Sequence, residues 1–366
     1  MPLRVLVVDD TAVFRRVVSD AFAALPDVEV VGVANHGRAA LAKIEELVPD
    51  LVSLDIEMPE VDGVQVLRTL KEKGLDVGVL VLSAHTQKGG DLTMKALELG
   101  AFDFITKPTK GNPDENRAWL SAELAPRVKA FARRREIQGL LRHGQAPPAT
   151  VVLKPTAPPP PQAAARPVSQ PPSRPELVAI GVSTGGPNAL VAVLPSLPAD
   201  FPVPILIVQH MPPLFTHSLA ASLNERCRIQ VKEAEAGEAI QKGVAYIAPG
   251  GKQMKVVADG GVKRLVVTDD PPENHCRPSV DYLFRSLAHG FPGKAAAVIL
   301  TGMGNDGTLG LRLMKRSGVH AIAQDEASCV VFGMPKEAIQ AGVIDVVAPL
   351  DRVASEIMRA VRGGTP

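Results

Sequence analysis

Residues 176–194 read "ELVAIGVSTGGPNALVAVL", an apolar run followed by a glycine-rich turn and then by a helical pattern. A short β-branched run that passes through such a turn into a helix is typical of a parallel sheet with helices between its strands. The alternation continues along this half of the chain, and it predicts further strands at 203–210, 243–249 and 295–302. Two runs after residue 250, separated by Gly260 and Gly261, predict a β-hairpin insertion.

The N-terminal half repeats the pattern, with helical stretches between short apolar runs. Its strands are predicted at 3–8, 28–34, 50–55, 77–83 and 101–107. Both halves are therefore expected to be α/β domains, each with a doubly wound parallel sheet. No solenoid-length repeat is visible.

A proline-rich stretch separates the two halves. Residues 147–175 hold 11 of the 33 prolines, including "PPPP" at 158–161, which predicts a semi-extended, poorly ordered spacer. Just before it, residues 128–142 predict an amphipathic helix that ends in a basic face. We therefore expect a first domain at 1–125, a helical extension and linker at 126–176, and a second domain at 177–366.

The composition bears on the partners and the cellular compartment of the protein. With 40 Lys and Arg against 39 Asp and Glu, the formal charge of +1 does not favour a nucleic-acid partner, and no basic recognition helix is visible. Three widely spaced cysteines without a C-x-x-C motif suit a reducing cytosol. Acidic residues at positions 9 and 10 are incompatible with a signal peptide, and no apolar run is long enough to cross a membrane. A cytoplasmic monomer that is not inserted in a membrane is expected.

Polar side chains end successive strands of the first half. They are Asp9 and Asp10, then Asp55, Ser83 and Lys107. Ligands bind beyond the carboxyl ends of strands in open parallel sheets, so these groups are expected around one crevice. Clustered carboxylates there suit Mg²⁺, and an aspartate beside the metal could accept a phosphoryl group.

These residues resemble the receiver domain of two-component response regulators, which has a flavodoxin-like fold. The resemblance covers residues 1–125 and rests on "VLVVDDTAVFRR", "LDIEMPEVDG", "LSAHT" and "GAFDFITKP". It implies that Asp55 accepts the phosphoryl group from a histidine kinase. It also implies that Asp10, Asp55 and the backbone carbonyl of Glu57 hold Mg²⁺, with Asp9 nearby.

The same resemblance assigns switch roles. Ser83 and Phe104 match the hydroxyl and aromatic positions that rearrange on phosphorylation, and Lys107 matches the lysine that offsets the phosphoryl charge. The family usually has a cis peptide bond at the position of Lys107–Pro108, so a cis bond is expected here.

Ser183 in the second half admits three interpretations. "GVSTG" fits the G-x-S-x-G pattern of an exposed nucleophile, but a serine before a helix is often an N-cap. A phosphate cradle is the third possibility, although no P-loop lysine and no G-x-G-x-x-G spacing accompany the glycines. The choice depends on whether the fold supplies a base.

Two other strand ends supply the missing partners. His210 follows the strongly apolar run "VPILIVQ", and Asp306 lies in the glycine-rich loop after "AVILTG". A histidine base oriented by a carboxylate would activate the serine. The chain order Ser, His, Asp differs from that of the α/β-hydrolases, so membership of that family is not implied.

The second half resembles the catalytic domain of chemotaxis protein-glutamate methylesterases, with a Rossmann-like sheet. The motifs are "IGVSTGGP", "VQHMPPLFT", "YIAPGGKQM", "RPSVDYLF", "ILTGMGNDG" and "DEASCVVFGMP". The resemblance implies a Ser183, His210, Asp306 triad without a cofactor in this domain. The Met303 amide would lie near the oxyanion, and we add the Thr184 amide as a second candidate donor.

The resemblance further implies that the protein demethylates glutamate methyl esters, and deamidates glutamines, on the cytoplasmic helices of chemoreceptors. Arg277 is a candidate substrate contact, whereas Cys276 stands where relatives carry histidine, so its role is open. Two rival hypotheses are a nucleotide-binding domain and a phosphorylation-controlled adaptor with an inactive hydrolase domain. No triad residue is missing, which argues against the adaptor.

Overall fold

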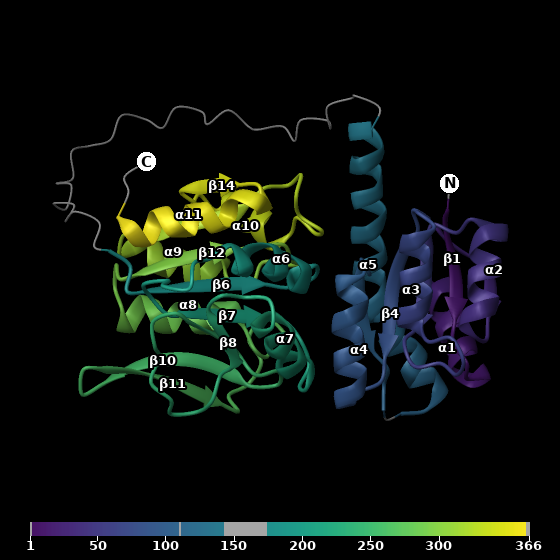
Figure 1. The fold of residues 1–366 in the computed structure, drawn as a ribbon, viewed down its shortest axis with the longest axis horizontal. Helices are drawn as coiled ribbons and strands as arrows, with labels where there is room; N and C mark the ends of the chain where they lie inside the picture. Colours follow the sequence, from purple (N-terminus) through teal and green to yellow (C-terminus); the bar gives the residue numbers. More distant parts are fainter. Residues whose placement is uncertain (1, 110, 143–173, 364–366) are drawn as a thin grey trace.

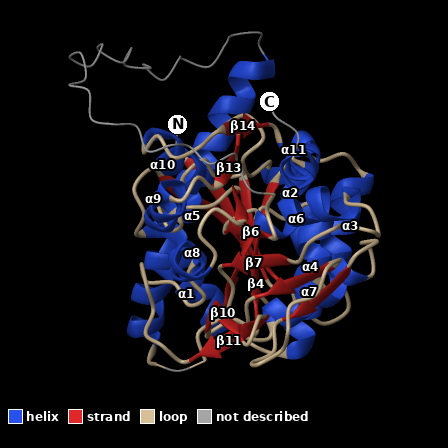
Figure 2. Ribbon diagram, turned by 90° about the vertical axis from the view of Figure 1, so that its left-hand side faces the viewer, coloured by secondary structure: helices blue, strands red, loops and turns tan. Residues whose placement is uncertain are grey.

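The computed structural model describes residues 2–109, 111–142 and 174–363, which form two α/β domains side by side (Figure 1). Most of the predicted proline-rich spacer lies outside these ranges. Helices cover both faces of the central strands when the molecule is viewed from the side of the second domain (Figure 2). No helix within the described ranges is both long and apolar enough to cross a bilayer.

The first domain is a parallel sheet with the strand order β2-β1-β3-β4-β5, the flavodoxin-like order expected for a receiver. Its strands are β1 (Leu3–Val8), β2 (Val28–Ala34), β3 (Leu51–Asp55), β4 (Gly78–Ser83) and β5 (Asp103–Thr106). Its helices are α1 (Ala12–Ala23), α2 (Gly37–Leu47), α3 (Gly63–Glu72), α4 (Gln87–Glu98) and α5 (Pro113–Arg142). The predicted strands are confirmed, with ends that differ by up to two residues.

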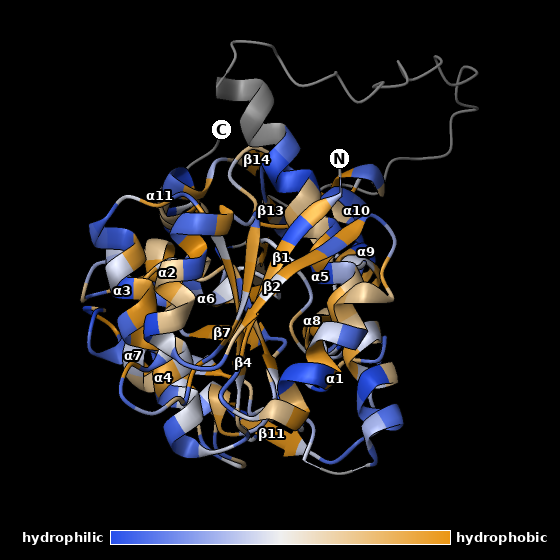
Figure 3. Ribbon diagram, turned by 90° about the vertical axis from the view of Figure 1, so that its right-hand side faces the viewer, coloured by the Kyte–Doolittle hydropathy of each residue, from blue (hydrophilic) through white to orange (hydrophobic). Residues whose placement is uncertain are grey.

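The central strands are apolar throughout because helices cover both of their faces. Figure 3 shows this for β1, which is largely hydrophobic between helices with hydrophilic outer faces. Its pairing with β3 aligns Val8 with Leu54, so the side chains that follow both strands emerge at one edge of the sheet.

Helix α5 is longer than the helix predicted at 128–142. It begins at Pro113, and Leu120, Leu124, Val128 and Phe131 are buried against the first domain. This spacing of four, four and three residues places the four side chains on one face. The helix therefore continues through the predicted domain boundary at residue 125.

The second domain is a seven-stranded parallel sheet with the order β14-β13-β12-β6-β7-β9-β8. Its strands are β6 (Leu177–Val182), β7 (Ile205–Gln209), β8 (Gln230–Glu233), β9 (Val244–Ile247), β12 (Ala295–Ile299), β13 (His320–Gln324) and β14 (Val346–Ala348). Its helices are α6 (Gly186–Val193), α7 (Phe215–Asn224), α8 (Val280–Gly290), α9 (Thr308–Arg316), α10 (Met334–Gln340) and α11 (Leu350–Arg362), with a 3₁₀ turn at Leu194–Ser196.

The predicted hairpin is confirmed as a separate antiparallel pair of strands, β10 (Gln253–Asp259) and β11 (Val262–Thr268). Strands β8, β13 and β14 were not predicted. β8 and β14 form the two edges of the sheet, and each is short and only partly buried, so neither carries a strong apolar signal.

The chain order reverses beside β6, whose neighbours are β7 on one side and β12 on the other. In doubly wound sheets such a switch point leaves a crevice beyond the strand ends, because the connecting helices leave toward opposite faces. Ser183, His210 and the loop with Asp306 come directly after these three strands. The topology therefore gathers the three predicted residues.

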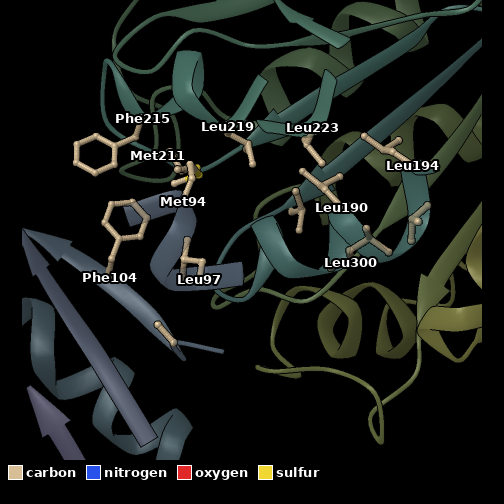
Figure 4. Close-up of a cluster of buried hydrophobic side chains, with 14 of the residues drawn as sticks. Met94, Leu97, Phe104, Leu190, Leu194, Met211, Phe215, Leu219, Leu223 and Leu300 are labelled. Carbon is tan, nitrogen blue, oxygen red and sulfur yellow. The ribbon is translucent and has the colours of Figure 1, made fainter. Parts of the chain in front are cut away.

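The two domains pack through apolar side chains. Helix α4 contributes Met94 and Leu97, which lie against a cluster from the second domain that includes Leu219 of α7 (Figure 4). Phe104 of β5 stacks on Phe215 with ring centroids 4.9 Å apart. These apolar and aromatic contacts hold the first domain against the second.

Candidate active site and phosphoacceptor site

Ser183 lies in the tight turn between β6 and α6. The turn needs glycine at Gly185, whose φ of +77° is left-handed, and at Gly186, where a Cβ would lie 1.9 Å from Gln209 Oε1. Gly185 is the N-cap of α6, and Ser183 precedes it by two residues. The N-cap interpretation of Ser183 is therefore wrong, because the glycine turn moves the serine off the helix end and toward the cleft.

His210 and Asp306 form the expected hydrogen-bonded pair. His210 Nε2 lies 2.8 Å from Asp306 Oδ2, and the carboxylate is buried. Burial alone would lower the pKa of His210, but hydrogen bonds with Asp306 and Cys276 outweigh it and raise this pKa to about 9. Asp306 thus orients the imidazole of His210, which lines the same cleft as Ser183.

Asp306 is held by donors other than the histidine. Oδ1 accepts hydrogen bonds from four groups: the Asn274 amide, the Ser279 hydroxyl, and the backbone N–H groups of Asp281 and Gly307. Oδ2 accepts from the Val280 N–H at 2.7 Å in addition to His210. Burial would raise the pKa of Asp306, but His210 and these donors outweigh it and lower this pKa to about 2. The carboxylate is therefore fixed in place and ionised.

The other ring nitrogen of His210 faces the cleft. Cys276 Sγ lies 3.7 Å from this nitrogen, Nδ1, within hydrogen-bonding distance for sulfur. Ser183 Oγ makes no hydrogen bond to any residue in the described part of the chain, although both side chains line the same cleft. Catalytic hydrogen bonds often form only when substrate binds, so the open geometry is compatible with a serine–histidine pair.

The cleft itself has a volume of about 600 Å³ and lies between the domains. Ser183, Thr184 and Met303 line it from the second domain, and Phe104 and Arg127 line it from the first. The backbone N–H groups of Thr184 and Met303 donate to no acceptor among the described residues. Both candidate oxyanion donors are therefore free beside the serine.

The residues of the predicted phosphoacceptor site also lie close together. Lys107 Nζ lies 2.7 Å from Asp9 Oδ2 and 2.7 Å from Asp55 Oδ2, while Asp10 is exposed beside them. Burial raises the pKa of Asp55 to about 6, although Lys107 opposes this effect. The single positive charge of Lys107 therefore balances only part of the negative charge of the carboxylates at this edge of the sheet.

The donor set fits Mg²⁺. Oxygen atoms of Asp9, Asp10 and Asp55 lie within 4.8 Å of one another, and all three ligands are hard carboxylates. Oε1 of Glu57 is buried without a hydrogen-bond partner in the described structure, so the side chain next to the expected carbonyl ligand is also unsatisfied. Asp10, Asp55 and the Glu57 carbonyl are the residues that would hold the ion.

Comparisons with known proteins match each of the two domains to a family. Residues 178–357 match the CheB methylesterase family, and residues 5–115 match the response regulator receiver domain. The protein-glutamate methylesterase/protein-glutamine glutaminase of Desulfotalea psychrophila is 54% identical over 98% of this chain and 99% of its own length. This chain belongs to the CheB methylesterase family.

Other members agree with this assignment. The Bacillus subtilis protein of the same name is 43% identical over 98% of this chain and 99% of its own. The crystal structure of the Thermotoga maritima CheB methylesterase catalytic domain is 43% identical, with a TM-score of 0.50, and covers 51% of this chain and 99% of that domain. The second domain therefore has the fold of a CheB catalytic domain.

The remaining predicted residue of the second domain is the candidate substrate contact, Arg277. Arg277 is exposed on the cleft wall, where its Nη1 lies 3.4 Å from the Asp269 carbonyl oxygen. Sequence reasoning missed Asn274 and Ser279, which hold Asp306. Both lie in "NHCRPSVD", where their only signal is the unusual density of polar residues before α8.

Of the three residues with predicted switch roles, Ser83 and Phe104 are buried and Lys107 is partly exposed. Ser83 Oγ donates to the Gly89 carbonyl at 3.1 Å, and Phe104 stacks on the catalytic domain. The expected cis bond at Lys107–Pro108 is wrong: within the described residues Arg277–Pro278 is the one cis peptide. The trans form is the lower-energy state of most X-Pro bonds.

Proposed function

We propose that this chain is a phosphorylation-activated esterase that hydrolyses γ-glutamyl methyl esters on the cytoplasmic helices of chemoreceptors and deamidates their glutamines. The observation that carries the proposal is the hydrogen-bonded pair of His210 and Asp306, because His210 lines the same cleft as Ser183. The names of the relatives support the substrate class. Incubation with methylated receptor and a small phosphodonor is expected to release methanol, and no release would contradict the proposal.

The proposed steps of ester hydrolysis follow from the orientation of the His210 imidazole. Nε2–H of His210 donates to Asp306, so Nδ1 carries the lone pair that accepts the Ser183 proton. Ser183 Oγ attacks the ester carbonyl, and the amides of Thr184 and Met303 stabilise the oxyanion. The imidazolium then protonates the departing methoxide, which leaves as methanol. Water attacks the acyl-enzyme by the same route and releases glutamate.

Deamidation uses the same groups. The tetrahedral intermediate formed from a glutamine side chain expels ammonia after protonation by His210, and it leaves the same acyl-enzyme. In both reactions charge develops on the carbonyl oxygen only after attack, so preorganised amides favour the transition state over the bound substrate.

The pH dependence of basal hydrolysis should reflect His210. Its pKa is raised to about 9, and only the neutral imidazole can accept the serine proton. We expect kcat/KM to rise roughly tenfold per pH unit above neutrality and to level off near pH 9. Initial rates of methanol release, corrected for spontaneous hydrolysis, would measure this. A plateau that begins near neutral pH would contradict the expected ionisation.

The proposal includes inhibition of the esterase by the unphosphorylated receiver. Asp103, Phe104 and Arg127 line the cleft that contains Ser183, and Phe104 stacks on Phe215. Burial raises the pKa of Asp103, with Arg127 and the Thr184 hydroxyl acting in the opposite direction. The receiver therefore reaches Thr184, the residue next to Ser183. We propose that phosphorylation of Asp55, with Mg²⁺ bound, loosens this docking and exposes the cleft.

Replacing Asp55 with asparagine tests this coupling. Asp55→Asn removes the phosphoacceptor, so methanol release is expected to stay at its low basal rate when a histidine kinase or a small phosphodonor is added. Asp27→Asn is a suitable control, because Asp27 is exposed and has a φ of +59°, which asparagine tolerates. Stimulation of Asp55→Asn equal to that of the wild type would show that activation does not pass through this residue.

A further inference from the structure

The catalytic cleft contains a second possible ligand set, made of soft as well as hard donors. His210, Cys276 and Asp306 each offer a ligand atom, and these atoms lie within 4.8 Å of one another. The closest sulfur–nitrogen pair is Cys276 Sγ and His210 Nδ1, at 3.7 Å. The proposed hydrolysis does not use the thiol, so its place beside the base calls for another explanation.

The separation of the two atoms matches a shared metal ion. Zinc–sulfur bonds of about 2.3 Å and zinc–nitrogen bonds of about 2.0–2.1 Å at a tetrahedral angle place the ligand atoms about 3.6 Å apart. Cys276 Sγ and His210 Nδ1 already lie at nearly this distance. An ion could bind both with little movement of the backbone.

The surroundings of His210 are those of a metal-bound histidine. In such sites the other ring N–H usually donates to a carboxylate, which fixes the ring and strengthens the ligand. Asp306 Oδ2 accepts from Nε2 at 2.8 Å, and five further donors hold this carboxylate. Asp306 would thus act as the outer partner of the ion and would not need to leave its present hydrogen bonds.

The cleft also has room for the remaining ligands. Its volume of about 600 Å³ accommodates an ion with bound water, and the exposed His275 lines the same wall next to Cys276. A thiolate and an imidazole select zinc over magnesium, whereas the hard carboxylates around Asp55 suit magnesium. The chain therefore offers two chemically distinct cation sites, one in each domain.

We propose that Zn²⁺ binds Cys276 Sγ and His210 Nδ1 in the catalytic cleft and inhibits the enzyme. The bound ion occupies the lone pair that must accept the Ser183 proton, so hydrolysis stops while the metal is present. Inhibition rests on the proposed function, whereas metal binding does not.

The test is calorimetric titration of the full-length protein with ZnCl₂ in buffer that contains excess Mg²⁺ to occupy the receiver site. The wild type is expected to bind zinc at the cleft, and Cys276→Ser should weaken this binding at least about tenfold. Cys276→His should retain binding, because it replaces one zinc ligand with another. Cys227→Ser is the matched control, a partly buried free cysteine outside the cleft, and should bind like the wild type.

Two further readouts separate the possible results. With Co²⁺ in place of zinc, the wild type should show a thiolate-to-metal charge-transfer band that Cys276→Ser lacks. Zinc should also reduce methanol release by the wild type more strongly than by Cys276→Ser. Equal zinc affinity in the wild type and Cys276→Ser, or no charge-transfer band, would overturn the proposal. Cysteine-dependent metal binding by a protein that releases no methanol would support the metal site and contradict only the proposed function.

Discussion

Ser183→Ala is expected to reduce methanol release from methylated receptor by at least about 10⁴-fold. Ser183 lies in the turn after β6, its Oγ is free of hydrogen bonds within the described structure, and it lines the same cleft as His210. Alanine at position 183 keeps the turn, because the positions that require glycine are Gly185, with its left-handed φ, and Gly186, where a Cβ would meet Gln209. The loss should therefore come from chemistry and not from misfolding.

Ser196→Ala provides the control for this measurement. Ser196 lies in the short 3₁₀ turn of the same domain and is exposed, and within the described ranges its hydroxyl donates only to the Ala192 carbonyl. Its replacement should leave methanol release unchanged. Equal release from the wild type and Ser183→Ala would mean that another group attacks the ester, and the proposed mechanism would then be wrong.

Asp306→Asn is expected to lower kcat by about 10⁴-fold while the protein stays folded. Four donors converge on Oδ1, so the asparagine carbonyl oxygen should take that position and its NH₂ group should replace Oδ2. The NH₂ group would then face His210 Nε2 and force it to accept a hydrogen bond. The ring proton would move to Nδ1, which could no longer accept a proton from Ser183.

The measurement compares the kcat and the thermal unfolding of Asp306→Asn with those of the wild type. The NH₂ group also faces the Val280 N–H, so some loss of stability is expected from this donor–donor contact. Asp351→Asn removes a charge from an exposed site on α11 and should change neither quantity much. A kcat within about tenfold of the wild type in folded Asp306→Asn would show that the carboxylate does not orient the base.

Much of the fold was predictable because local sequence patterns report it directly. Apolar β-branched runs predicted the central strands, since those strands are buried on both faces. Edge strands β8 and β14 were missed, because each is short and partly exposed. The full length of α5 was missed as well: only its last part was predicted as a helix, while the buried face that fixes its first half points into the receiver core.

The sequence by itself determined which residues reach the site. Ser183, His210 and Asp306 each come after a buried strand, and parallel strands deliver the residues at their carboxyl ends to one edge of the sheet. The same reasoning brought Asp9, Asp55 and Lys107 together. These predictions needed only the chain direction and the apolar pattern, both of which are local properties.

Only the tertiary structure decided how the gathered groups face one another. In the folded protein, Nε2 of His210 bonds Asp306, and Nδ1 lies near Cys276. Asn274 and Ser279 donate hydrogen bonds to the Asp306 carboxylate. These contacts join residues 27 to 96 positions apart in the chain, and no local pattern encodes the direction of a side chain across such a distance. The stacking of Phe104 on Phe215 has the same origin, because it depends on how two separately folded domains pack.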